Sequence, residues 1–102
     1  MQGEVKRTGE KRLEKLAGII NDLTRNPVRT WVVEPGAGKP KYVAQVGNYH
    51  LDHNDAGWRL QQVVGDRGGI VEVSPRLTKG QMEVWLRAFL KGLQYWGSWP
   101  CG

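Results

Sequence analysis

Histidine and aspartate are concentrated in one six-residue stretch of the chain, which contains His50, Asp52, His53 and Asp55. Imidazole and carboxylate groups are metal ligands and proton-transfer groups, and on a β-strand the side chains of His50 and Asp52 project from the same face. The spacing does not fit a calcium loop that begins at Asp52. Ala56 would occupy a ligand position, and Val63 stands where the bidentate glutamate is required.

A histidine-metal nuclease is also disfavoured, because no second histidine or asparagine follows the stretch on a helix. We therefore interpret the cluster as polar residues on the exposed face and turn of a hairpin, and predict no metal site. A pH-sensitive or catalytic role for these residues is the alternative.

Two further patterns resemble catalytic or phosphate-binding motifs but lack essential residues. Gly36-Ala-Gly38-Lys39 has the glycines and lysine of a phosphate loop, yet Val33 replaces the first glycine and Pro40 replaces the magnesium-binding hydroxyl. Ser74 and Ser98 lie outside any nucleophile-elbow motif, and both histidines fall in one hairpin. The sequence therefore predicts no catalytic residues, no cofactor and no enzymatic activity.

The charge balance is more informative. The chain has 15 lysines and arginines and 10 aspartates and glutamates, which gives a formal net charge of +5. Such a balance favours contact with polyanions, although solvated surface charge explains it equally well. Trp99, in a carboxyl-terminal tail that should not be helical, is a candidate anchor for a partner, unless it folds back onto the domain. The candidate residues for binding nucleic acid or another partner are Lys11, Arg12, Lys15, Lys39, Lys41, Arg59, Arg67, Arg76, Lys79 and Trp99.

The helix that organises the fold spans residues 78–96. Thr78 and Gln81 have the spacing of a capping box, and Gly97 supplies a stop. Apolar residues recur at three- and four-residue steps and predict one buried stripe: Met82, Trp85, Leu86, Phe89, Leu90, Leu93 and Trp96.

An amino-terminal helix is predicted from Thr8, a possible cap, to the residue before Pro27. Its apolar stripe consists of Leu13, Leu16, Ala17, Ile20 and Leu23. We expect one domain over residues 1–102, with segments 1–7 and 97–102 flexible.

Alternation and turn residues predict four or five strands between the helices, at residues 28–34, 41–46, 49–53, 58–64 and 70–74. Gly47-Asn48 has the composition of a two-residue hairpin turn. Short connections favour an antiparallel meander, so the fold class is α+β, a two-layer sandwich with both helices across one face. The other face would carry His50, Asp52, Arg59 and Gln61. Trp58 and Trp85, together with Trp96, fit core positions, and Trp31 is a further candidate.

Cys101 is the only cysteine, so no internal disulfide can form, and a reducing compartment is expected. No run of about 20 apolar residues is long enough to cross a bilayer. We expect a cytoplasmic protein with no membrane contact.

The stretch from Tyr42 to Leu93 resembles a group of small, functionally uncharacterised accessory proteins encoded by bacteriophages and prophages. The matching segments are the hairpin 46–51, Gly57-Trp-Arg-Leu60, Gly68-Gly-Ile70, Ser74 to Lys79 and Leu90-Lys-Gly-Leu93. Residues 54–56 depart from the pattern, because those proteins more often have alanine-tyrosine-glycine there. The resemblance implies a phage origin and action in the host cytoplasm, and it implies no biochemical activity.

The order of helix, sheet and helix also resembles that of double-stranded-RNA-binding domains, in which basic residues at the start of the second helix meet phosphates. Here Lys79 is the lone basic residue of that first turn, with Glu83 close by, so the analogy is one of topology. We expect a non-catalytic binding module, with nucleic acid slightly favoured as its partner. The alternative is a protein inhibitor of a host defence system, anti-CRISPR-like, that binds a host protein such as a defence nuclease.

Overall fold

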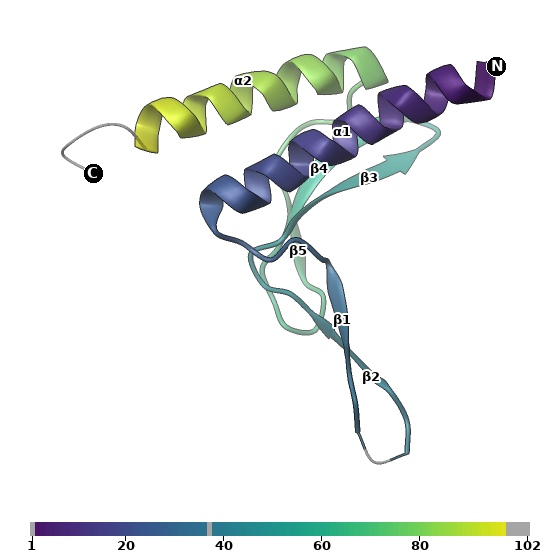
Figure 1. The fold of residues 1–102 in the computed structure, drawn as a ribbon, viewed down its shortest axis with the longest axis vertical. Coiled ribbons are helices and arrows are strands. Elements are labelled where there is room, and N and C mark those ends of the chain that lie inside the picture. Colours follow the sequence, from purple (N-terminus) through teal and green to yellow (C-terminus); the bar gives the residue numbers. More distant parts are fainter. Residues whose placement is uncertain (1, 37, 98–102) are drawn as a thin grey trace.

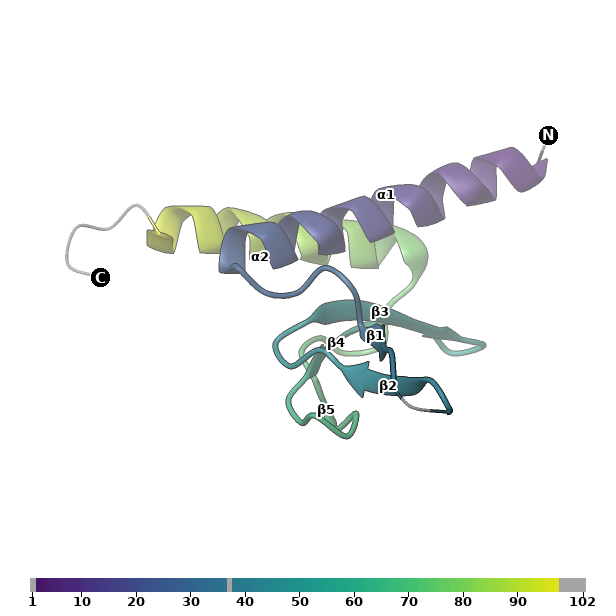
Figure 2. The ribbon, with the colours of Figure 1, turned by 60° about the horizontal axis from the view of Figure 1, so that its bottom comes forward.

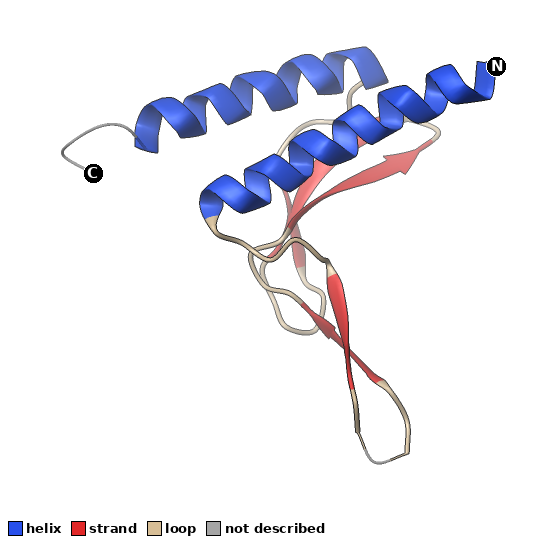
Figure 3. Cartoon of the chain, viewed as in Figure 1, coloured by secondary structure: helices blue, strands red, loops and turns tan. Residues whose placement is uncertain are grey.

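The computed structural model describes residues 2–36 and 38–97, and their side chains from Gly9 to Tyr95. Two helices enclose five strands along the chain (Figures 1 and 3). The elements in order are α1 (Gln2–Thr24), β1 (Trp31–Glu34), β2 (Lys41–Ala44), β3 (Tyr49–Asn54), β4 (Gly57–Val63), β5 (Ile70–Glu72) and α2 (Lys79–Gly97). The predicted α+β class is confirmed.

The two helices lie side by side and run in the same direction (Figure 1). Near their amino ends, Gly9 of α1 lies against the side chain of Lys79, and Arg12 Nε is 3.5 Å from Glu83 Oε1 of α2. Figure 2 shows that the helices form one layer and the strands the other. Both helices therefore cover the same side of the strands.

The strands divide into two antiparallel sheets. One sheet has the order β3-β4-β5, and the other contains only β1 and β2. The β1–β2 hairpin extends away from the helices and from the larger sheet (Figure 1). We call β1, β2 and the described connecting residues 35–36 and 38–40 the arm. Its projection helps explain a radius of gyration of 15.5 Å, compared with about 13 Å for a compact domain of this length.

The core lies between the helices and the larger sheet. Fully or nearly fully buried apolar residues come from α1, α2 and β4, and they are Leu13, Leu16, Ala17, Ile20, Met82, Leu86, Trp58 and Leu60. Trp85, Phe89, Leu90 and Leu93 pack against this cluster, which confirms the stripe predicted for α2 as far as Leu93. The side chain of Trp96 lies outside the described residues. In the stripe predicted for α1, Leu23 is an exception, because it is about half exposed in the last turn of that helix.

The helix ends show how local sequence fixes the boundaries. The capping box of α2 is present, since Gln81 N donates to Thr78 Oγ1 and Thr78 N donates to Gln81 Oε1, at 3.2 and 3.0 Å. The helix α1 begins at Gln2, so Thr8 lies within it and does not cap it. It ends at Thr24, and Arg25 takes the positive φ (59°) that usually falls to glycine.

The predicted hairpin turn at Gly47-Asn48 is wrong, because β2 and β3 are not paired. Gly47 N donates to Val63 O, and Val63 N donates to Asn48 O, which extends the β3–β4 pairing by one residue pair. Asn48 N donates to Gln45 O at 3.1 Å, so residues 45–48 do form a turn, but this turn does not pair β2 with β3. The chain consequently passes from the arm into the larger sheet without folding back on β2.

Candidate functional site: the aromatic face of the arm

The arm presents two large aromatic side chains to solvent. In its register Trp31 pairs with Ala44 and Val33 pairs with Tyr42, so Trp31 and Tyr42 share one face of the hairpin. Trp31 is 48% exposed and Tyr42 is 66% exposed. Trp31 therefore does not join the core between the helices and the larger sheet.

The loop between β4 and β5, residues 64–69, approaches the arm at Trp31. A Cβ atom built on Gly68 would lie 2.9 Å from Cη2 of the indole, and Gly68 has a φ of +94°. The loop is closed by its own hydrogen bonds, from Gly68 N to Gly65 O (3.0 Å) and from Val64 N to Gly69 O (2.8 Å). Glycine is thus required at position 68 both for the backbone conformation and for the close approach of the indole.

A hollow of about 420 Å³ lies between the arm and this loop. We call it the arm hollow, and its lining residues are Trp31, Glu34, Lys41, Tyr42, Val43, Asp66 and Arg67. Two of these side chains are cationic and two are anionic. Among the described residues, none of the four takes part in a salt bridge. Their charged groups are thus available to a ligand.

A buried asparagine holds the base of the arm in place. Asn48 is fully buried, its Nδ2 donates to Pro27 O at 2.8 Å, and its Oδ1 accepts from Thr30 Oγ1 at 3.0 Å. Just after β2, Gln45 N donates at 2.9 Å to the carbonyl oxygen of Thr30, the residue before β1. These contacts tie the segment before β1 to the start of β3, so the orientation of the arm depends on one side-chain amide.

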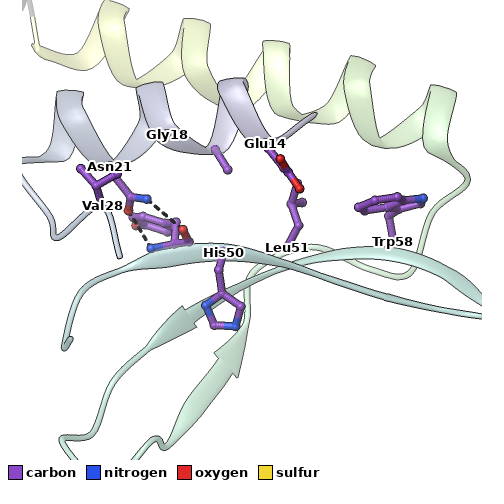
Figure 4. A pocket seen from close by; sticks show the side chains of 9 residues that line it. Glu14, Gly18, Asn21, Val28, His50, Leu51 and Trp58 are labelled. Carbon is purple, nitrogen blue, oxygen red and sulfur yellow. Dashed lines mark hydrogen bonds between the residues drawn. The ribbon is translucent and has the colours of Figure 1, made fainter. Parts of the chain in front are cut away.

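A second buried asparagine fixes α1 to the outer edge of the larger sheet. Asn21 Nδ2 donates to Tyr49 O at 2.9 Å, and Tyr49 N donates to Asn21 Oδ1 at 2.7 Å, as Figure 4 shows. The amide thereby satisfies the edge of β3 as a neighbouring strand would. Beside it lies a smaller hollow of about 290 Å³, whose lining includes Glu14, Gly18 and Leu51.

The histidine and aspartate cluster is separated by the fold. His50 Nε2 lies 3.1 Å from Gln61 Oε1, and its imidazole points away from α1 (Figure 4). His53 stacks on Trp58 with a centroid distance of 4.2 Å. Asp52 Oδ2 lies 2.8 Å from Arg76 Nη1. Within the described part of the chain, no three histidine, cysteine, aspartate or glutamate residues are grouped so that they could hold a metal ion.

The predicted polar face of the sheet is confirmed. His50 is the cross-strand partner of Gln61, and Asp52 is the partner of Arg59, so all four lie on one side of β3 and β4. The neighbouring residues Trp58 and Leu60 point to the core on the other side.

Three of the predicted binding residues are engaged within the protein. Arg12 pairs with Glu83, Arg59 with Glu72, and Arg76 with Asp52. Arg76 Nη1 also donates to Asp52 O (3.3 Å) and to Gly57 O (3.2 Å), and its side chain is only 16% exposed. These contacts join the end of the β3–β4 hairpin to the segment that leads into α2, which is a structural role.

The remaining predicted binding residues lie in different parts of the structure. Lys11 and Lys15 are exposed on α1, in the helical layer, and Lys79 lies against Gly9 at the start of α2. Lys39 lies in the arm's connecting segment, and only Lys41 and Arg67 line the arm hollow. Trp99 lies outside the described residues. The basic residues are therefore spread over both layers. Lys41 projects from the other face of the hairpin, and the arm hollow is the place that Lys41 and Arg67 line together with the exposed rings.

Sequence reasoning missed Tyr42 and placed Trp31 only provisionally. A usable signal was the run of apolar residues Trp31, Val32 and Val33 followed by a proline- and glycine-rich connection. Such a run points to a strand with apolar side chains on both faces, which a two-stranded hairpin cannot bury.

No described helix has the length and apolar character needed to cross a membrane. Comparisons of this chain with protein-family models, with curated proteins and with solved structures found no match.

Proposed function

We propose that this chain is a non-catalytic binding module, a bacteriophage accessory protein acting in the host cytoplasm, whose arm contacts nucleic acid. The phage assignment rests on the resemblance of residues 42–93. The choice of partner rests on one observation, the coincidence of exposed Trp31 and Tyr42 with the cations Lys41 and Arg67 around the arm hollow.

Aromatic side chains and basic groups act together in proteins that bind nucleic acid. Bases stack on exposed rings, and lysine or arginine contacts the phosphates that follow. The arm offers both on a surface that projects from the body of the protein (Figure 1). Lys39 precedes β2, and Lys41 is its first residue. A projecting hairpin can reach a strand or a groove that the flat helical layer cannot reach.

The rival function, inhibition of a host defence protein through protein–protein contact, is favoured by a separate observation. Val64, Ile70 and Val71, in and beside β5, are each about half exposed. Apolar side chains at a sheet edge suit a protein interface better than a polyanion.

Fluorescence anisotropy with labelled single-stranded DNA, single-stranded RNA and duplex DNA at two salt concentrations tests the proposal. We expect binding that weakens as salt rises, because cation–phosphate contacts release counterions. The double variant Trp31→Ala/Tyr42→Ala should bind at least tenfold more weakly, since each stacked base contributes about 1–3 kcal/mol.

Tyr95→Ala is the matched control, because Tyr95 on α2 is 64% exposed, close to the 66% of Tyr42. Its affinity should equal that of the unmodified protein. Absence of binding to every nucleic acid at low salt would reject the proposal and favour the inhibitor function.

A further inference from the structure

We infer that the arm hollow is a binding site for one unpaired guanine base of a single-stranded nucleic acid, stacked on Trp31 or Tyr42 and read by the charged groups around it. The inference rests on the proposed function and adds the class of ligand and the side chains that recognise it. It is carried by the chemistry of the hollow's lining, taken together with its shape.

The aromatic rings of the hollow are open to a ligand. Trp31 and Tyr42 lie diagonally on the same face of the hairpin, and neither stacks on another described aromatic ring. Gly68 supports one edge of the indole and leaves about half of the side chain exposed. A flat base can therefore cover a ring that solvent covers in the free protein, which is favourable because both surfaces are largely apolar.

The polar groups of the hollow suit a base better than a phosphate. Lys41 and Arg67 are balanced by Glu34 and Asp66, so the lining carries no net charge at neutral pH. A phosphate inside the hollow would meet two carboxylates beside the two cations, so the net attraction there is weak and an uncharged base edge is the better occupant. The phosphates that flank the base contact Lys41 and Arg67 from outside the hollow. A base edge, by contrast, presents hydrogen-bond donors and acceptors side by side without a formal charge.

Guanine fits this mixed lining best among the bases. Its O6 and N7 accept hydrogen bonds from lysine or arginine, and its N2 amino group donates to an acceptor. A carboxylate is an acceptor, so Asp66 of the β4–β5 loop can take the amino hydrogens while Arg67 takes the O6/N7 edge. Glu34 and Lys41 project from the other face of the hairpin and border the hollow. Thymine and uracil offer a single N3–H donor between two carbonyls, and adenine and cytosine carry an amino group but lack the O6/N7 pair of acceptors, so none of them matches both kinds of charged group as guanine does.

The base must be unpaired, because the edges read in the hollow and the faces stacked on the rings are covered in a duplex. Sequence-specific contact with single strands generally uses bases that are splayed out and stacked on aromatic side chains. The β4–β5 loop bounds the hollow on the side opposite the arm.

The test compares three probes in anisotropy titrations with the whole protein. They are an eleven-nucleotide oligothymidine, the same strand with one central guanine, and that guanine strand annealed to its complement. We expect the single guanine to tighten binding about tenfold over thymine alone, and expect annealing to abolish the gain. Equal affinity for the two single strands would overturn the inference and leave the proposed function standing, whereas no binding to any probe would overturn both.

Substitutions in the hollow distinguish specific hydrogen bonding to the base from non-specific electrostatic effects on the phosphates. The double variant Glu34→Ala/Asp66→Ala should reduce the guanine preference to about twofold or less, because both carboxylate acceptors are removed while both rings remain. Glu14→Ala is the control, since Glu14 is an exposed carboxylate on α1 away from the arm, and it should keep the full preference. A Glu34→Ala/Asp66→Ala protein that binds both strands more tightly with an unchanged ratio would show that the carboxylates only repel phosphate, contrary to the inference. All three residues are exposed, so these variants should fold normally.

Discussion

The indole of Trp31 rests against Gly68, and a Cβ atom at position 68 would stand 2.9 Å from Cη2 and 3.2 Å from Cζ2 of the ring. The contact joins the arm to the β4–β5 loop, two parts of the chain that belong to different sheets. It sets the position of the aromatic face relative to Asp66 and Arg67. The geometry of the arm hollow therefore depends on a residue without a side chain.

Gly68→Ala should disturb the protein in two ways. The backbone φ of +94° is unfavourable for alanine, with a cost of about 1–3 kcal/mol, and the new methyl group must displace the indole. We expect a lower urea midpoint and a nucleic-acid affinity reduced at least threefold. Unchanged values for both would show that the contact does not position Trp31.

Gly92→Ala should have the opposite effect on stability. Gly92 lies in the interior of α2, a Cβ there would meet no atom within 4 Å, and alanine restricts the unfolded chain more than glycine does. We expect an increase of about 0.5–1 kcal/mol in the free energy of unfolding. Thermal denaturation followed by circular dichroism measures it, and a loss of stability would mean that α2 contacts an element not seen beside it.

Asn21→Ala should be among the most destabilising single substitutions. It removes both hydrogen bonds to the backbone of Tyr49 and leaves a largely buried N–H and C=O without partners, at about 1–3 kcal/mol each. Asn21→Asp should be no more stable than Asn21→Ala, because the carboxylate can accept from Tyr49 N but is buried and places its second oxygen against Tyr49 O. Urea midpoints of both variants should lie below that of the unmodified protein, and an alanine variant as stable as the unmodified protein would contradict this role.

Asn48→Ala should loosen the arm more than the rest of the protein. The amide of Asn48 joins Pro27 and Thr30, which precede β1, to the start of β3. In hydrogen exchange followed by mass spectrometry, the substitution should therefore accelerate exchange, relative to the unmodified protein, more in residues 31–44 than in α2. Thr30→Val removes only one of these hydrogen bonds and should give a smaller increase in the same segment. Uniform acceleration across the whole chain would indicate global destabilisation without a specific hinge.

Arg76→Ala and Arg67→Ala should have opposite consequences, although both arginines were predicted as binding residues. Arg76 is largely buried and contacts Asp52 and the carbonyl of Gly57, so its loss should lower stability by about 1.5–3 kcal/mol with little change in nucleic-acid affinity. Arg67 is exposed beside the arm hollow, so its loss should lower affinity and spare stability. Paired urea denaturation and anisotropy titrations distinguish the two roles, and a binding defect in a well-folded Arg76→Ala protein would contradict this division.

Much of the fold follows from local patterns. The apolar steps of Met82, Leu86 and Leu90 and the Thr78–Gln81 box defined α2, and the alternation around His50 and Asp52 assigned the outer face of the sheet correctly. These features depend on residues within one or two turns of helix or one strand, so local sequence is enough to specify them.

The strand pairing could not be read in the same way. Gly47-Asn48 has the composition of a hairpin turn, yet Asn48 and Gly47 bond to Val63, which lies fifteen residues or more along the chain. Composition gives the tendency to turn, and the competition between β2 and β4 for the same hydrogen bonds is decided only by three-dimensional packing. The separation of the arm from the larger sheet is the result of that competition.

The sequence by itself determined that this is an α+β domain with two amphipathic helices, a surplus of basic groups and no complete catalytic motif. Only the tertiary structure decided which basic groups are engaged in ion pairs and which stand beside exposed rings. The physical reason is that charge is a property of a residue, whereas its availability depends on partners such as Glu72, Glu83 and Asp52 that are distant in the chain. The arm hollow likewise exists only because Gly68, more than 30 residues after Trp31, lets the loop meet the indole.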